Sequence, residues 1–586
     1  MGTRGVVTSG HYLATAAGFR IMEEGGNAID AAAAMGFCLN LLEPHQNGLG
    51  GDVPMLIHSA KKKRVFAISG MGWSPKAFTI DWCRENGIDL IPGDGYLPAC
   101  APAPVGTWAA ALARFGTMSF AEVLRPAIEL AEHGFPMYDG LHYALSGNSQ
   151  KFTEKYPSTG EVYLPGGRAP RIGEVFRNPD FANTLKLLCK AEDASKHKGR
   201  IAGIDAARDA FYKGDIAKRI VEFIHENPVE DASGKSHAGL FTYEDFAEWQ
   251  ATVEDPLTVN YRGLDVYKCS SWTQGPVFLQ QLTILEGFDL KAMGPASADY
   301  IHTWIECAKL AFADREGYYG DPLLDDPPFD VLLSKGYAAE RRELIRDEAS
   351  MELRPGDAGE GAPDYVTFDV LEDNRRALNM ARADDPEAQT NSDADTTQLE
   401  AIDSDGNMVA ATPSGGWIPS SPVIRGLGFP LGTRGQMFYL NALRPNALEP
   451  RKRPRATLTP SMVTKDGQPY MAFGTAGGDC QDQWTLQFFL NYVDFGMNLQ
   501  EALDGLEFQS DHFPSSFYPR GCAPGTMQID DRTPADVIEE LKRRGHKIGG
   551  VHAFATKVMG IRYDKENGVI LGGARSTGNI TSTMGW

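Results

Sequence analysis

The sequence is poor in three features that would each suggest a function. Its eight cysteines are scattered and form no CxxC pair, which is typical of a reduced compartment and indicates no zinc-type cluster. Basic residues are outnumbered, with 56 Lys and Arg against 77 Asp and Glu, and the resulting net charge of −21 argues against nucleic acids and anionic membrane surfaces as partners. The longest apolar run, AIDAAAAMGFCLNLL, contains Asp30 and is too short to span a membrane.

The N-terminal residues MGTRGVVTSGHYLATAA lack the apolar core of a signal peptide. We therefore expect a cytoplasmic protein. The alternative is a protein whose leader peptide has been removed from the sequence. No motif indicates a cofactor or a metal ion.

Helical periodicity dominates the first part of the chain. Apolar residues recur at helical spacing from His11 to Glu24, and Gly25-Gly26 end that helix. Asn27 suits the N-cap of a second, alanine-rich helix that runs to about Leu42. Residues 96–344 are mostly helical in pattern. Farther along, Thr533 is the expected N-cap of a helix that has Pro534 at its first position.

The helical pattern ends in the second part of the chain. Between Met351 and Asp395 the sequence loses periodicity and gathers Asp, Glu, Pro and Gly, which predicts an exposed segment that is mobile until something anchors it. The stretch DTTQLEAIDSDGNMVAAT then reads as a β-hairpin that turns at Asp405-Gly406. A last hairpin is expected about Asn567-Gly568. Helices combined with antiparallel hairpins predict a layered α+β sandwich.

The Thr396–Thr397 pair has two interpretations. Threonine is β-branched and favours strands, so the pair can be ordinary strand chemistry. Alternatively the chain is cut between Asp395 and Thr396. The freed α-amine, with an ordinary pKa of about 7.7–8.0, then serves as base for the Thr396 hydroxyl.

The order of several motifs favours the second interpretation. EEGGNAIDAAAAMGFCLNLLEP, GLGGD, the DTTQLEAID hairpin, KRPRATLTPSMVTKDG and FGTAGGD follow one another along the chain. That order resembles the γ-glutamyltranspeptidase family of N-terminal-nucleophile hydrolases from about Gly5 to Gly573. The resemblance implies a four-layer αββα sandwich built from two chains cut from one precursor. These would be a large subunit, residues 1–395, and a small subunit, residues 396–586, which together form one structural unit.

The resemblance also implies roles for individual residues. Thr396 matches the family's nucleophile, and Ser414 matches a hydroxyl that supports it. Gly477 and Gly478 match the glycine pair whose backbone N–H groups form the oxyanion hole. Thr457 matches one of two serines that hold the substrate's α-carboxylate, whereas Ala456 replaces the other. Independently of the resemblance, Trp417 in the loop after Ser414 can be a pocket wall or part of the core, and we favour the pocket wall.

Departures from the family pattern concern the substrate. Met71 stands where an arginine binds the glutamyl α-carboxylate, and Asn441 and Arg444 stand where a glutamine and an acidic residue are expected. A γ-glutamyl zwitterion should then bind poorly. An acyl group without an α-amine but with a distal carboxylate suits Arg444 better, unless Arg444 is simply a surface charge.

The sequence therefore predicts an autoprocessing amidohydrolase that uses water as its main acceptor. An ordinary γ-glutamyltransferase or glutathione hydrolase is the first alternative, and an uncleaved binding protein is the second. The implied partners are a small-molecule amide and the two subunits themselves. Self-association of the processed heterodimer stays open.

Overall fold

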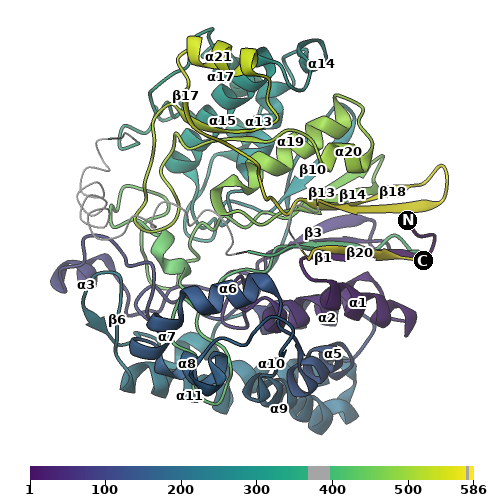
Figure 1. The fold of residues 1–586 in the computed structure, drawn as a ribbon, viewed down its shortest axis with the longest axis vertical. Helices are drawn as coiled ribbons and strands as arrows, with labels where there is room; N and C mark the ends of the chain where they lie inside the picture. Colours follow the sequence, from purple (N-terminus) through teal and green to yellow (C-terminus); the bar gives the residue numbers. More distant parts are fainter. Residues whose placement is uncertain (367, 369–395, 576–579) are drawn as a thin grey trace.

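We describe the protein from a computed structural model, which covers residues 1–366, 368, 396–575 and 580–586. Two antiparallel sheets face each other at its centre (Figure 1). The first sheet has the order β20-β1-β11-β12-β2-β3-β8. Its strands are β1 (Gly5–Ser9), β2 (Met55–Ser59), β3 (Arg64–Ile68), β8 (Val253–Glu254), β11 (Leu399–Asp403), β12 (Met408–Ala411) and β20 (Ser582–Gly585).

The second sheet has the order β19-β18-β14-β13-β10-β9. Its strands are β9 (Leu257–Tyr261), β10 (Leu264–Lys268), β13 (Ser461–Lys465), β14 (Gln468–Gly474), β18 (Met559–Asp564) and β19 (Val569–Ala574). Apolar side chains from both sheets, such as Leu56, Ala410 and Ala472, share one buried cluster. This cluster is the core between the two sheets.

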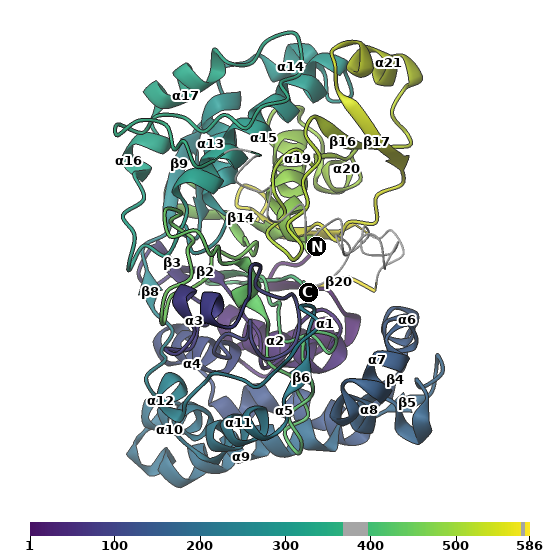
Figure 2. The same ribbon diagram turned by 90° about the vertical axis from the view of Figure 1, so that its left-hand side faces the viewer.

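Helices cover the outer face of each sheet, as Figures 1 and 2 show. The first sheet is covered by α1 (Tyr12–Glu23) and α2 (Ala28–Leu42), which share a core cluster with Val7, Leu399 and Ala411. The second sheet is covered by α13 (Pro276–Leu285), α15 (Ala298–Tyr318) and α19 (Gln481–Val493), which pack with Val266, Val463 and Phe473. The predicted αββα sandwich is therefore confirmed.

Further helices extend both outer layers. Those below the first sheet in Figures 1 and 2 are α4 (Pro104–Phe115), α5 (Phe120–His133), α6 (Asp139–Gly147), α7 (Ser149–Glu154), α8 (Pro157–Tyr163), α9 (Pro179–Ser195), α10 (Arg200–Tyr212) and α11 (Asp215–Glu226). At the opposite end lie α14 (Leu290–Met293), α17 (Lys335–Arg342), α21 (Ala535–Arg543) and a small sheet of β15 (Phe508–Ser510), β16 (Thr526–Asp530) and β17 (Lys547–His552).

Local expectations about helix ends are mostly met. Asn27 caps α2 with a capping box to Asp30, and Gly25, with φ +97°, ends the turn after α1. The expected N-cap at Thr533 is wrong, because Pro534 itself has an extended ψ of 139° and occupies the cap position of α21. Proline at the cap shifts the helix start by one residue.

Both parts of the chain contribute to each sheet. β11 pairs with β1 on one side and with β12 on the other, and the β11–β12 hairpin turns at Gly406 as predicted. The terminal strand β20, which the sequence did not indicate, closes the edge of the first sheet against β1. Residues before and after position 396 are therefore interleaved.

The acidic segment expected to be mobile is described only in part. Residues 369–395 lie outside the described residues, and the Asp395 half of the expected cleavage site lies among them. The earlier part, in contrast, is anchored on α15: the Tyr365 hydroxyl donates to Gly317 O at 2.8 Å and the Gly356 N–H donates to Asp314 Oδ1 at 2.7 Å. In this part α15 supplies the anchor that the prediction allowed for.

Candidate active site

Thr396 is fully buried and lies three residues before Leu399, the first residue of β11. It forms an isolated antiparallel bridge with Ser414, which follows β12 across the hairpin. The two hydroxyl oxygens are 3.0 Å apart, and both residues have an exposed fraction of 0%. The hairpin therefore places the expected nucleophile against the expected supporting hydroxyl.

Arg434 extends this pair. Its Nη2 donates to Ser414 Oγ, and its Nε donates to Asp52 Oδ2 at 2.9 Å. Burial raises the pKa of Asp52 to about 6, although the adjacent Arg434 opposes that shift. A guanidinium held by Asp52 thus fixes the Ser414 hydroxyl, which leaves Ser414 oriented toward Thr396.

The GLGGD motif lets two backbones approach closely at this point. The Asp52 N–H donates to Ser414 O at 2.7 Å, and the Ser414 N–H donates back to Asp52 O at 3.0 Å. A Cβ atom at Gly50 would collide with Pro430 O, and one at Gly51 would collide with Ser414 O. Only glycine fits at positions 50 and 51, and the close packing that it allows supports the backbone of Ser414.

The expected oxyanion glycines lie in a sharp turn after β14. Gly477 has φ +130° and Gly478 has φ +52°, so both occupy backbone conformations that favour glycine. A Cβ atom at Gly477 would collide with the Trp484 ring. Within the described residues neither backbone N–H donates a hydrogen bond, so both donors are available to a developing oxyanion.

One aromatic ring connects the glycine turn to the Thr396 side of the site. Phe517 is the nearest neighbour of a Cβ built on Gly478, at 3.0 Å. The Arg434 guanidinium lies over the same ring, 5.8 Å from its centroid. Trp417 also lies beside Arg434, with 5.4 Å between guanidinium and ring centroid. Arg434 therefore lies between the two aromatic rings that flank the site.

The predicted substrate residues Thr457 and Met71 lie in different surroundings. Thr457 is buried, and its Oγ1 has no hydrogen-bond partner among the described residues. Such a buried hydroxyl is costly unless a ligand or a water pairs with it. Met71, in contrast, packs with Trp272 and Ala456 in the apolar core between the sheets.

Asn441 and Arg444 lie in a turn after η5 (Arg434–Met437), and Asn441 is partly buried. Arg444 has an exposed fraction of only 3%, so the interpretation as a surface charge is wrong. Its Nη1 donates to Glu316 Oε2 at 3.2 Å, and its guanidinium lies 4.1 Å from the ring centroid of Tyr439. Arg444 is therefore part of a buried charge cluster.

Sequence reasoning missed Arg434 and Asp52. Asp52 lies inside the GLGGD motif, but a lone glycine-rich loop gives no signal for a buried carboxylate. Arg434 lies in the loop of residues 416–435, where no local pattern indicates a partner near position 52. A parallel bridge between Gly50 and Leu431 brings the segment that carries Arg434 beside Asp52.

The described residues were searched for membrane-spanning helices, metal sites and disulfides. None of their helices is long and apolar enough to cross a membrane. No group of three or more His, Cys, Asp and Glu side chains in this part of the chain is arranged to hold a metal ion. No two cysteines within the described ranges are joined by a disulfide.

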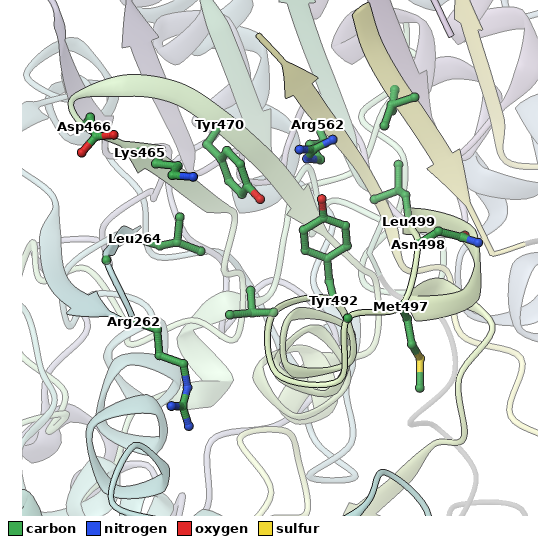
Figure 3. A pocket seen from close by; sticks show the side chains of 14 residues that line it. Arg262, Leu264, Lys465, Asp466, Tyr470, Tyr492, Met497, Asn498, Leu499 and Arg562 are labelled. Carbon is green, nitrogen blue, oxygen red and sulfur yellow. The ribbon is translucent and has the colours of Figure 1, made fainter. Parts of the chain in front are cut away.

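A separate hollow lies at the far end of β14. It has a volume of about 690 Å³, and its lining includes Arg262, Tyr470, Tyr492 and Arg562 (Figure 3). Tyr470 precedes Gly477 by seven residues, which corresponds to about 20 Å along an extended chain. This hollow is therefore not part of the Thr396 site.

Comparisons with known proteins agree with this geometry. The family model described as gamma-glutamyltranspeptidase matches residues 14–582. The chain is 31% identical to the glutathione hydrolase-like YwrD proenzyme of Bacillus subtilis, over 99% of this chain and 98% of that protein. Among solved structures, the cephalosporin acylase of Bacillus halodurans superposes with a TM-score of 0.82 at 28% identity, covering 100% of this chain and 96% of that one. The structure described as LmbA2991HD superposes with a TM-score of 0.89 at 40% identity, covering 100% and 98%.

Proposed function

The chain belongs to the gamma-glutamyltranspeptidase family, and we propose that Thr396 is the nucleophile of an autoprocessing amidohydrolase specific for acyl groups that lack an α-amine. The observation that carries this proposal is the buried pair of hydroxyl groups on Thr396 and Ser414, fixed by Arg434. The interleaving of residues 1–395 and 396–586 supports their roles as large and small subunits that stay together after cleavage.

Maturation uses the same hydroxyl as catalysis. Thr396 Oγ1 attacks the carbonyl carbon of Asp395, the peptide C–N bond breaks, and the Thr396 nitrogen takes up a proton as the new α-amine. Water then hydrolyses the ester and releases the Asp395 carboxylate. Ser414 orients the attacking oxygen in this step.

In turnover the α-amine of Thr396 takes the proton from Oγ1 while the oxygen attacks the substrate's amide carbonyl. The backbone N–H groups of Gly477 and Gly478 donate to the oxyanion, an interaction that contributes about 3 kcal/mol per donor in comparable sites. Collapse expels the leaving amine with a proton and leaves an acyl ester on Thr396. Water resolves the ester, so hydrolysis is the main outcome.

The substrate preference rests on the groups around the site. Met71 offers no cation for an α-carboxylate and packs into the core instead. The unpartnered Thr457 hydroxyl and the partly exposed Trp417 and Asn441 are the proposed contacts for the acyl group. Arg444 contributes through its charge cluster, which favours a distal carboxylate. A cytoplasmic location and self-association of the heterodimer stay predictions from the sequence.

A matched pair of chromogenic donors tests this proposal. Glutaryl-p-nitroanilide and γ-glutamyl-p-nitroanilide differ only in the α-amine, and each is assayed with and without glycylglycine. We expect a higher kcat/KM for the glutaryl donor and no requirement for the acceptor. A preference for the γ-glutamyl donor with strict acceptor dependence would make the chain an ordinary transferase. Absence of any turnover by a cleaved protein would favour a binding role.

A further inference from the structure

Four buried arginines surround one carboxylate next to the oxyanion turn. We call Arg315, Arg444, Arg455 and Arg520 the arginine cluster; their exposed fractions lie between 0% and 3%. Arg315 and Glu316 lie near the end of α15, whereas the other three come from segments after β12 and β15. Residues distant in sequence therefore bring four guanidinium groups into one buried place.

The carboxylates in contact with the cluster are too few to neutralise it. Glu316 accepts from Arg455 at 2.9 Å, from Arg444 at 3.2 Å and from Arg315 at 3.0 Å. Arg315 is also paired with Asp479. Among the described residues, four guanidinium groups thus share two carboxylates, which leaves an excess of two positive charges.

Arg520 is the member without a carboxylate partner in the described part of the chain. Its Nη2 donates to two backbone oxygens, Gln436 O at 2.8 Å and Phe438 O at 2.7 Å. Its guanidinium also lies 4.1 Å from the ring centroid of Tyr439. Burial lowers the pKa of Arg520, although Tyr439 and Glu316 oppose that shift; an arginine nevertheless stays charged in a protein.

Several donors of the cluster point at nothing within the described residues. Nε and Nη1 of Arg520 have no hydrogen-bond partner there, and neither do Nε of Arg444 and Nε of Arg455. Buried donors without partners are rare, and a buried charge without a counter-charge is costly. A water molecule could accept these hydrogen bonds, but it would leave the excess positive charge uncompensated.

We propose that the arginine cluster is a binding site for one small monovalent anion, either a halide or a carboxylate, which accepts hydrogen bonds from Arg520. The burial of all four arginines selects for an anion small enough to be enclosed. A free halide is independent of the proposed function, whereas the acyl group's own carboxylate as ligand rests on it.

The cluster is coupled to the oxyanion turn by Asp479, which directly follows Gly478. Asp479 accepts from Arg315 and from both the N–H and the hydroxyl of Ser516, each of the latter at 2.7 Å. Arg455 also donates to Ser516 Oγ at 3.3 Å. An anion that fixes the guanidinium groups therefore fixes the turn that carries the oxyanion donors, and we expect it to raise kcat.

The first test is an anion titration. The mature enzyme is transferred to sodium isethionate, whose sulfonate anion is neither a halide nor a carboxylate, and chloride or bromide then replaces isethionate at constant ionic strength. We expect a saturable rise in Tm of about 5 °C and a parallel rise in kcat. The Arg520→Met variant should lose both responses, and Arg425→Met, which removes an exposed guanidinium paired with Glu161, should retain them. Equal Tm and kcat values before and after the halide exchange would overturn the proposal.

A second measurement does not depend on the variant's folding or on turnover. Crystals of the wild-type protein grown in bromide should show an anomalous peak within hydrogen-bond distance of the Arg520 guanidinium, and its absence would overturn the proposal. If chloride raises KM for the glutaryl donor in competition, the natural ligand is the acyl carboxylate. If it raises kcat alone, the ligand is a free halide. Failure of all donors to turn over would contradict the proposed function but leave the bromide peak unchanged.

Discussion

The hydroxyl oxygens of Thr396 and Ser414 lie 3.0 Å apart, at the two ends of one hairpin and without any solvent exposure. The Ser414 hydroxyl also accepts from the buried guanidinium of Arg434, which holds the Ser414 oxygen in place beside the expected nucleophile. We therefore place this pair at the centre of both maturation and turnover.

The first prediction concerns Ser414. Ser414→Ala removes the acceptor of the Arg434 guanidinium as well as the partner of Thr396, so we expect maturation and kcat to slow by about 10- to 100-fold. The cleavage half-time on a denaturing gel and single-turnover kinetics measure the two effects. Ser421→Ala, which removes a hydroxyl bonded to Leu431 O on the neighbouring loop, should change neither. Wild-type rates in Ser414→Ala would show that the pair has no role.

The second prediction concerns the oxyanion turn. Gly477→Ala strains the backbone at φ +130° and drives a methyl group into Trp484, so we expect kcat to fall about 10²- to 10³-fold while KM changes little. Gly467→Ala is the matched control, because Gly467 also has a positive φ but open space around it. If both variants lose activity equally, general destabilisation explains the effect.

The hairpin and the helices could be predicted from the sequence because their signals are local. Asn27 and Asp30, only three positions apart, form a capping box at the start of α2. Asp405-Gly406, two adjacent residues, mark the hairpin turn between β11 and β12. The pairing of β1 with β11 and the closure by β20 depend on partners hundreds of residues apart, which no local pattern contains.

The residues of the candidate site also differ in whether a local sequence pattern could indicate them. The family motifs carry Thr396, Gly477 and Gly478. Arg434 and Asp52, in contrast, become neighbours through the bridge between residues 50 and 431, which no local pattern contains. The interpretation of Arg444 as a surface charge failed because its counter-charge, Glu316, lies on a helix 128 residues earlier in the chain.

The third prediction follows from the raised pKa of Asp52. Burial raises this pKa from 3.8 to about 6, so the folded state binds a proton more tightly than the unfolded state. The resulting stability is fully present below pH 3.8 and is lost as the pH rises through 6; it amounts to roughly 3 kcal/mol. The amide introduced by Asp52→Asn does not titrate. The Tm of the wild type minus the Tm of this variant should therefore become smaller as the pH rises from about 4 to about 7, because only the wild type loses the contribution of the protonated carboxyl group.

This difference is measured by thermal denaturation in a Thr396→Ala background, which keeps the chain in one piece. A Tm difference that is constant across the pH range would show that Asp52 is ionised throughout, and would contradict the prediction.

The fourth prediction concerns Thr457, whose hydroxyl is buried and lacks a partner among the described residues. If it donates to the acyl group, Thr457→Val should raise KM for the glutaryl donor by about tenfold and leave maturation unchanged. Thr464→Val is the control, since that hydroxyl lies on β13 and bonds to Tyr267. An unchanged KM would exclude Thr457 from the substrate site.

The central claim is that Thr396 cuts its own chain, and intact mass spectrometry of freshly purified protein tests it most directly. A cut before Thr396 divides 586 residues into 395 and 191, so the 63.9 kDa chain should give pieces of about 43 and 21 kDa. We expect both pieces for the wild type and a single whole chain for Thr396→Ala. A Thr396→Ala protein that is cut at the same bond would contradict the claim.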